Sequence, residues 1–409
     1  MSNALRLLLS LSSAEKKLRG LQYTPAEIAG QVDLWPTTLE RFIGFLPEVR
    51  PFLQEFLARN RRCVVLTGAG TSEYVGLCVE GLLRRLWGLP VNTISSTALV
   101  ARPQDFFVPA HATLLVSLAR SGSSPESLGA VRIAEGLPDP VYHLLLTANP
   151  DGELARAAGG LERARLLALD ERTNDRSLAM TGAFTNLVLA GQMLAHAFSF
   201  EEYSRLFPRI VEGGRALLDR APDPLAALCR SDFDRAVFLG DGPHFGTAVE
   251  SRLKLQELSG GRIMCAYDTF PGLRHGPEAV IHERTLTGAF LSEDPFARRY
   301  ELELLQELRR KRVGQAVLAV ADRLGEAGAL ADVGLEYDPE GKLQVPAEYA
   351  PPIQVMAGQL AGMFKGLELG LQPDNPSAAG IIHRVVEGVK VYDPWAFRGR
   401  GRFEILAQR

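Results

Sequence analysis

The sequence predicts an α/β protein made of two doubly wound parallel-sheet domains, each a flavodoxin-like sandwich, preceded by an N-terminal helical arm. A length of 409 residues exceeds what one hydrophobic core usually serves. Short β-rich runs alternate with helical runs, as in a parallel sheet covered on both faces. The pattern then recurs: Gly68 and Gly240, Thr113 and Thr285, and Leu145 and Val317 each lie 172 positions apart. We therefore expect a duplicated domain.

The elements follow in order along the chain. In the arm, Thr24 is expected to cap a helix, with Pro25 at its first position and Glu27 in its first turn. The first domain is expected to contain strands at 63–66, 113–116 and 144–146, and helices at 74–87 and 125–136.

The domain boundaries follow from breaks in composition. A polar helical stretch begins at Glu201 and is broken by the prolines at 222 and 224. We divide the chain into a helical arm (1–48), a first domain (49–212), a second domain (213–372) and a C-terminal tail (373–409). The basic run at 398–402 is interpreted as a solvated tail, since the rest of the chain is not basic.

The composition excludes several classes of protein. With 45 Lys and Arg against 48 Asp and Glu, the net charge of −3 offers no general attraction to nucleic acid or an anionic membrane. The four cysteines form no C-x-x-C pair, which favours a reducing compartment and argues against structural zinc. No apolar stretch approaches the roughly 20 residues that span a bilayer, and residues 1–11 lack the features of a signal peptide. We expect a cytoplasmic protein.

A glycine loop follows the first strand and opens a helix. Gly70, Thr71 and Ser72 stand where main-chain N–H groups and the helix dipole can hold an anion such as phosphate. The loop is not a dinucleotide fingerprint, because Glu73 occupies the place of the third glycine. Tight turns also need glycine for steric reasons alone.

A second loop after the neighbouring strand strengthens the phosphate interpretation. It contains Arg120, Ser121, Ser123 and Ser124, which combine a guanidinium with hydroxyl groups just before a helix. Two such loops at adjacent strand ends predict one phosphate cradle. The alternative is that these serines only cap helices.

Acid–base chemistry is suggested by the second half. Glu250, Lys254 and Glu257 share one helix face by their spacing, although a solvated stripe of ion pairs has the same pattern. This helix follows the loop that contains Gly240 and Gly242, so its first turns are expected at the strand ends. His275 lies in a glycine- and proline-bound loop. A histidine, a carboxylate and a lysine suffice to open a cyclic sugar and move a proton between adjacent carbons. No cofactor or metal is required, although His275 and His282 are close enough to leave a metal open.

These residues resemble the sugar isomerase (SIS) domain superfamily, and the whole chain resembles the AgaS branch of tandem-SIS phosphosugar isomerases/deaminases. The matching segments run in order along the chain: 24–29, 70–72, 119–127, 173–181, 253–258, 274–277, 373–376 and 384–389. The chain is also similar to the isomerase half of glucosamine-6-phosphate synthase.

The resemblance implies a 6-phosphosugar ligand and a homodimer or higher oligomer with shared active sites. It implies phosphate binding by Ser72, Ser121 and Ser124, proton transfer by Glu257, ring opening by His275 and stabilisation of the intermediate by Lys254. In glucosamine-6-phosphate synthase, the segment that corresponds to the His275 loop comes from the neighbouring subunit. Glu250, Thr181 and Arg384 are further candidate substrate-binding residues.

The expected function is an isomerase/deaminase for an amino-sugar 6-phosphate, galactosamine 6-phosphate giving tagatose 6-phosphate and ammonia. A simple ketose/aldose 6-phosphate isomerase shares the same proton shuttle, so the sequence does not separate the two. A non-catalytic sugar-phosphate sensor is the other alternative, and it has no need of Lys254, Glu257 and His275 together. The sequence does not decide the galacto or gluco epimer.

Overall fold

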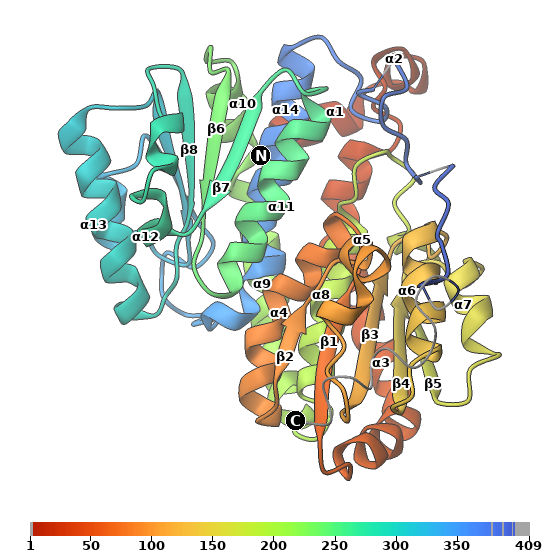
Figure 1. Ribbon diagram of the computed structural model, residues 1–409. Coiled ribbons are helices and arrows are strands. Elements are labelled where there is room, and N and C mark those ends of the chain that lie inside the picture. Colours follow the sequence, from red (N-terminus) through yellow and green to blue (C-terminus); the bar gives the residue numbers. More distant parts are fainter. Residues whose placement is uncertain (1–2, 378, 387, 395, 397–409) are drawn as a thin grey trace. The chain divides into compact units, whose positions relative to one another are not determined.

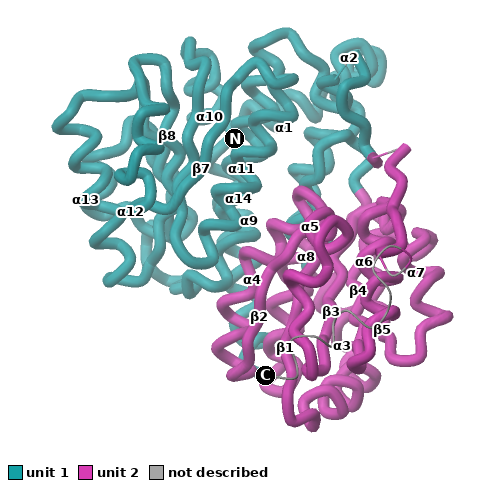
Figure 2. Tube along the Cα trace, in the orientation of Figure 1, with its two compact units in different colours: residues 1–35, 175–185, 201–384 teal, residues 36–174, 186–200, 385–409 magenta. Residues whose placement is uncertain are grey.

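The computed structural model describes residues 3–377, 379–386, 388–394 and 396, and these form two compact units. Unit 1 comprises residues 1–35, 175–185 and 201–384, and unit 2 comprises 36–174, 186–200 and 385–409 (Figure 2). The basic run at 398–402 and Glu387 of the 384–389 segment lie outside the described residues. No helix in the described part of the chain has the length and apolarity to cross a membrane.

Unit 2 contains the first parallel sheet, in the order β2-β1-β3-β4-β5 (Figure 1). Its strands are β1 (Arg62–Thr67), β2 (Val91–Thr93), β3 (Ala112–Ala119), β4 (Val141–Thr147) and β5 (Ala164–Ala168). Its helices are α4 (Thr71–Trp87), α5 (Ser96–Ala101), α6 (Pro125–Glu135) and α7 (Glu153–Ala158). Parts of α3 (Thr24–Leu57) and α8 (Gly182–Ala195) also belong to this unit. The strands and helices predicted from the sequence in this region are confirmed.

Alternate strand residues of this sheet pack against different helices. Val65, Leu115 and Leu145 form a core with residues of α5, α6 and α7. On the other face, the Tyr142 ring packs edge-on against Phe52 and Phe56 of α3. The sheet is therefore covered on both faces, which explains why its strands read as continuous apolar runs.

Unit 1 contains the second parallel sheet, in the order β10-β9-β8-β6-β7. Its strands are β6 (Arg235–Leu239), β7 (Met264–Asp268), β8 (Thr285–Phe290), β9 (Ala316–Ala321) and β10 (Val333–Glu336). Its longer helices are α9 (Phe200–Arg220), α10 (Pro222–Cys229), α11 (Pro243–Leu258), α13 (Pro295–Lys311) and α14 (Pro351–Glu368), with the short α12 (Phe270–Leu273). Residues of α12 and α13 cover one face, and the stacked rings of Phe238 and Phe290 lie on the other. The helix predicted from Glu201 and its break at Pro222 are confirmed as α9 and α10.

The two sheets have the same topology, as the constant offset of 172 residues predicts. Strands β1, β3 and β4 correspond to β6, β8 and β9, and the parallel strand orders are equivalent. The agreement extends to single torsion angles: Gly70 has φ 56° and ψ −126°, and Gly242 has φ 55° and ψ −124°. Glycine alone adopts this conformation readily.

The N-terminal segment is helical, as predicted, with α1 (Ala4–Ser10) and α2 (Ser13–Arg19) preceding the 34-residue α3. Helix α3 begins at Thr24, whose hydroxyl donates to the Asp374 carboxylate (2.8 Å). The expected capping role of Thr24 is therefore taken over by a residue 350 positions away.

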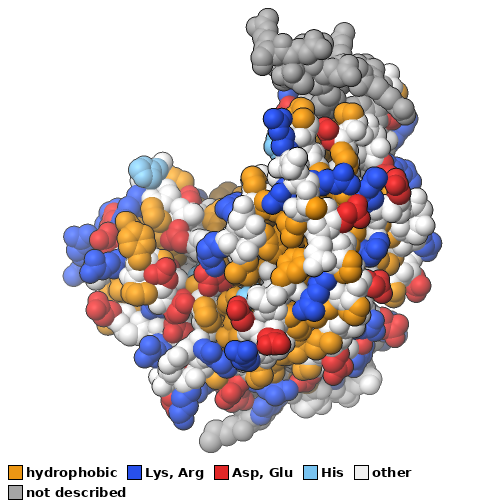
Figure 3. Space-filling view, turned by 90° about the horizontal axis from the view of Figure 1, so that it is seen from below, with side chains coloured by type: hydrophobic (Ala, Val, Ile, Leu, Met, Phe, Trp, Pro, Cys, Tyr) orange, Lys and Arg blue, Asp and Glu red, His pale blue; other side chains and the backbone are white. Residues whose placement is uncertain are grey.

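The surface carries both charge signs. On the face shown in Figure 3, Lys and Arg side chains are interspersed with Asp and Glu side chains. This agrees with the balanced composition.

Candidate functional site

A buried lysine lies between two carboxylates on α11. The Lys254 ammonium lies 2.7 Å from Glu257 Oε2 and 3.3 Å from Glu250 Oε1, one helical turn away on either side. The side chains of Lys254 and Glu250 are completely buried, whereas 21% of the Glu257 side chain is exposed. The prediction that these three residues share a face is confirmed, and the alternative of a solvated stripe is wrong. Of the two carboxylates, Glu257 is the one that a ligand can reach.

Close packing against α14 fixes this part of α11. A Cβ atom at Gly362 would lie 2.8 Å from the Lys254 carbonyl oxygen, and side chains at Gly358 and Gly366 would clash with Ser251 and Leu258. The three glycines repeat every four residues, so they form one smooth stripe on α14. The main chain that bears Lys254 is therefore held by direct helix–helix contact.

The cluster formed by Glu250, Lys254 and Glu257 lies far from the carboxyl ends of the strands in its own sheet. Helix α11 begins at Pro243, so Lys254 is 11 residues and about 16 Å along the axis, at 1.5 Å per residue. The first turns of α11 do lie at the carboxyl end of β6, as expected, but the Lys254–Glu257 pair lies in the last turns of the helix. His275, by contrast, follows the carboxyl end of β7 by seven residues and is exposed. Within the described residues, no hydrogen bond or ion pair joins His275 to Glu257.

In unit 2 the glycine loop lies where β1 meets α4. Gly70 is the first flanking residue of α4 and no side chain caps that helix end. Gly68 packs so closely that a Cβ atom there would lie 2.7 Å from the Ser72 carbonyl carbon. Thr71 and Ser72 are mostly buried. The glycines thus have a steric role, and they also leave the helix N-terminus open to an anion.

The serine loop lies at the same edge of the sheet, because β1 and β3 are adjacent and parallel. Ser124 flanks α6, but its side chain makes no capping bond; its hydroxyl lies 2.7 Å from the Ser127 hydroxyl instead. Ser121 Oγ accepts from the Ser123 N–H (3.3 Å), and Ser121, Ser123, Ser124 and Arg120 are all partly exposed. The interpretation of Ser124 as a simple helix cap is therefore wrong.

A third loop supports the serine loop from behind, and sequence reasoning missed it. Asn149, after β4, donates from Nδ2 to the Ser121 carbonyl (2.8 Å), and the Leu154 N–H donates to the Gly122 carbonyl (2.7 Å). A Cβ atom at Gly152 would lie 2.6 Å from the Ser121 oxygen. The turn-forming sequence at 149–152 was the signal that could have identified this loop.

Known proteins resemble this chain over most of its length. No family model matches it. An AgaS protein of Streptomyces coelicolor is 37% identical over 385 residues, covering 90% of this chain and 95% of the relative. The D-galactosamine-6-phosphate deaminase AgaS of Escherichia coli is 33% identical over 375 residues, covering 91% and 96%. The chain belongs to the AgaS family.

Solved structures agree with this assignment. A Clostridium novyi structure superposes with a TM-score of 0.90 at 33% identity, covering 96% of this chain and all of the other. The tagatose-6-phosphate ketose/aldose isomerase of Escherichia coli gives a TM-score of 0.83 at 30% identity, covering 91% and 97%. These likenesses confirm the predicted sugar isomerase fold.

Two AgaS segments meet at Asp175. Its carboxylate accepts from the main-chain N–H groups of Thr181, Gly182 and Ala183 (2.8–3.0 Å) and from the Thr181 hydroxyl (3.1 Å). Arg384 Nε donates to the Asp175 carbonyl (2.8 Å). Thr181 is completely buried. Both candidate residues thus have structural contacts, and their contact with substrate stays a prediction.

Two further carboxylates in unit 1 tie the AgaS segments together. Asp374 accepts from the main-chain N–H groups of residues 22–24 and holds the start of α3. Glu27 accepts from Arg176 N and Ser177 Oγ, and burial together with the nearby Asp175 raises the Glu27 pKa to about 6. These contacts show that the segments help to build the fold.

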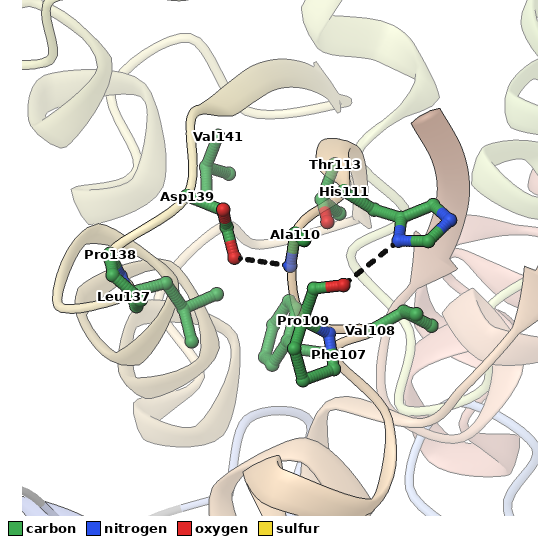
Figure 4. Close-up of a pocket in the computed structure, with 10 residues that line it drawn as sticks. All are labelled: Phe107, Val108, Pro109, Ala110, His111, Thr113, Leu137, Pro138, Asp139 and Val141. Atoms are coloured by element: carbon green, nitrogen blue, oxygen red, sulfur yellow. Dashed lines mark hydrogen bonds between the residues drawn. The ribbon is translucent and has the colours of Figure 1, made fainter. Parts of the chain in front are cut away.

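A pocket of about 200 Å³ in unit 2 lies away from these loops (Figure 4). It is lined by residues of 107–113 and 137–141, which precede β3 and β4, whereas the phosphate loops follow the carboxyl ends of strands. Its position at the opposite sheet edge excludes it from the predicted cradle.

His282, which the sequence analysis considered together with His275 as a possible metal ligand, has protein partners in the structure. His282 lies 3.5 Å from Asp234, and its Nδ1 accepts from the Arg284 N–H (3.0 Å). No group of three or more potential metal ligands occurs in the part of the chain that the structure describes.

Proposed function

We propose that this protein is a D-galactosamine-6-phosphate deaminase that releases ammonia through an aldose–ketose isomerisation. The observation that carries the proposal is the Lys254–Glu257 pair, in which a buried ammonium lies 2.7 Å from a carboxylate that a ligand can reach. Two relatives with this enzyme name are 32–33% identical to the chain, and each alignment covers more than nine-tenths of it.

The reaction uses each group of the cluster. In the open-chain sugar, Glu257 takes the proton from C2, and the electrons of that bond form the C1–C2 double bond of an enolamine. The Lys254 ammonium stabilises the negative charge that develops on oxygen. Glu257 then returns the proton to C1, giving an imine at C2. Water adds to this imine, and ammonia leaves as the C2 ketone forms.

Phosphate binding belongs to the loops of unit 2. No side chain caps the N-termini of α4 and α6, which lie beside these loops, and a helix N-terminus favours an anion. Arg120, Ser121 and Ser123 provide side-chain donors. Gly70, Thr71 and Ser72 line the first of the two loops.

Ring opening is assigned to His275 as general acid–base. The His275 ring is exposed and follows the carboxyl end of β7, whereas Glu257 lies in the last turn of α11. We therefore expect His275 to serve the active site of a second copy of the chain. The active form would then be a homodimer or higher oligomer. Four free cysteines and a sugar-phosphate substrate fit a cytoplasmic location.

A simple ketose/aldose isomerase is the second candidate. The solved relative at 30% identity is named a tagatose-6-phosphate ketose/aldose isomerase. The same proton transfer by Glu257 would interconvert a ketose 6-phosphate and an aldose 6-phosphate without releasing ammonia. A sensor would need no buried lysine beside a reachable carboxylate.

The deciding experiment measures ammonia release from galactosamine 6-phosphate and glucosamine 6-phosphate. Glu257→Gln should lower turnover by about 10²–10⁴-fold, and the adjacent, exposed Gln256→Ala should not change it. Ketose–aldose interconversion without ammonia would favour the simple isomerase. Ligand-induced thermal stabilisation with no turnover would favour a sensor.

A further inference from the structure

The loop that carries His275 is attached to one helix on both sides. Just before His275, Arg274 Nε lies 2.8 Å from Glu307 Oε2 on α13. Three residues after His275, Glu278 Oε1 lies 2.6 Å from Lys311 Nζ, also on α13. The two helix residues are themselves paired, with Lys311 Nζ 2.7 Å from Glu307 Oε1. One chain of four charges therefore spans the histidine loop.

The geometry of this network favours a fixed loop position. Glu307 and Lys311 are four residues apart, with the acid on the N-terminal side, which is the better orientation for a helical pair. Glu307 and Lys311 each form two ion pairs, one with each other and one with a residue of the loop. The hydrogen bonds from Lys311 and Arg274 lower the Glu307 pKa, which favours its charged form.

The loop places a glycine directly after His275. Gly276 has φ +115°, a conformation that only glycine adopts easily, and a Cβ atom there would have no neighbour within 4 Å. The His275 ring is exposed, and its main-chain N–H donates to the Gly272 carbonyl (2.9 Å). An acid–base group has to be held close to its productive position. The external network is a means of doing so.

We propose that Glu307 and Lys311 are positioning residues that hold the His275 imidazole in place for ring opening. This inference rests on the proposed function. Neither residue touches the reacting atoms in this scheme; both act through the loop.

Kinetics of matched variants test the inference. Glu307→Gln and Lys311→Met should lower kcat by about 10–100-fold, the range known for a displaced catalytic group, and change KM less than about two-fold. Lys311→Arg keeps both ion pairs and should restore most of the turnover. Arg309→Met removes a different ion pair of the same helix, to Asp332 (2.9 Å), and should leave kcat unchanged. Equal losses in Arg309→Met, or no loss in Glu307→Gln, would overturn the inference.

A double variant separates positioning from general destabilisation. If Glu307 acts through His275, then His275→Ala with Glu307→Gln should be no slower than His275→Ala alone. Multiplying effects would show that Glu307 acts elsewhere.

Hydrogen exchange gives a readout that needs no activity. Amide exchange in peptides covering 274–282 should be faster in Glu307→Gln than in the wild type and unchanged in Arg309→Met. Unchanged exchange in Glu307→Gln would disprove the network's role even if the wild type released no ammonia. An absence of ammonia release with faster exchange would instead reject the proposed function alone.

Discussion

The carboxyl edges of the two sheets differ, although the sheets share a topology and their glycine loops share torsion angles. In unit 2 the residue after the second glycine is Thr71, which has both an N–H and a hydroxyl. In unit 1 the equivalent residue is Pro243, which has no N–H. Asp241 also stands where unit 2 has Ala69, and burial raises the Asp241 pKa to about 6. The edge in unit 1 is thus poor in donors and rich in carboxyl groups.

The loops after β3 and β8 show the same contrast. In unit 2 the Ser124 hydroxyl does not cap α6. In unit 1 the Ser292 N–H donates to the buried Glu301 carboxyl (3.1 Å), and Asp294 caps α13 through the Phe296 N–H (2.8 Å). In unit 1 acidic side chains bond to this loop and cap its helix, whereas no side chain caps the corresponding helix of unit 2. This comparison supports the proposal that the phosphate binds to the loops of unit 2.

The largest effect is expected from the buried cation of unit 1. Lys254→Met removes the ammonium that lies 3.3 Å from the buried Glu250 carboxylate, and breaking a buried pair lowers the free energy of unfolding by about 3–5 kcal/mol. Chemical denaturation measures this loss. Adding Glu250→Gln should recover part of the stability, but not the turnover. A Lys254→Met protein as stable as the wild type would contradict the burial seen here.

The next effect comes from making the serine loop of unit 2 acidic like its counterpart in unit 1. Ser121→Asp should raise KM by about 100-fold, because a carboxylate repels the phosphate by several kcal/mol. Ser121→Asn is the matched control of similar size without charge, and it should raise KM far less. Steady-state kinetics at fixed ionic strength distinguishes the two. Equal KM values for both variants would mean that the phosphate binds elsewhere.

Local features of both units were predictable, and distant contacts were not. The strands follow from apolar runs, and the shared face of Glu250, Lys254 and Glu257 follows from helical spacing. The support of the serine loop by Asn149 depends on tertiary contact, and so does the bond between Thr24 and Asp374, 350 positions apart. Helix α3 also continues through Pro36, Pro47 and Pro51, which local rules would treat as breaks. Sequence spacing places groups on one element but does not say which elements meet.

A pH-dependent effect is expected at the edge of unit 1. Burial raises the Glu301 pKa to about 8 from its ordinary value near 4.5, so the folded protein favours the protonated acid. The stabilisation is complete below pH 4.5 and is lost as the pH rises towards 8, at up to about 1.4 kcal/mol per pH unit. Glu301→Gln should flatten this dependence. Thermal unfolding at pH 6 and pH 8 checks it, and parallel curves for both proteins would refute the assigned pKa.

The smallest effects provide the closest comparison, because they involve two helix-flanking residues at equivalent strand ends. Asp294→Ala removes a cap from α13 and should lower the free energy of unfolding by about 1 kcal/mol without changing KM. Ser124→Ala removes no helix cap, only a hydroxyl that bonds the partly buried Ser127 hydroxyl, so stability should fall by less than in Asp294→Ala, while KM should rise by about 3–10-fold through loss of one phosphate bond. Chemical denaturation gives the free energy of unfolding of each variant, and steady-state kinetics gives its KM. The reverse pattern, with Ser124 stabilising the fold and Asp294 affecting KM, would exchange the roles of the two edges.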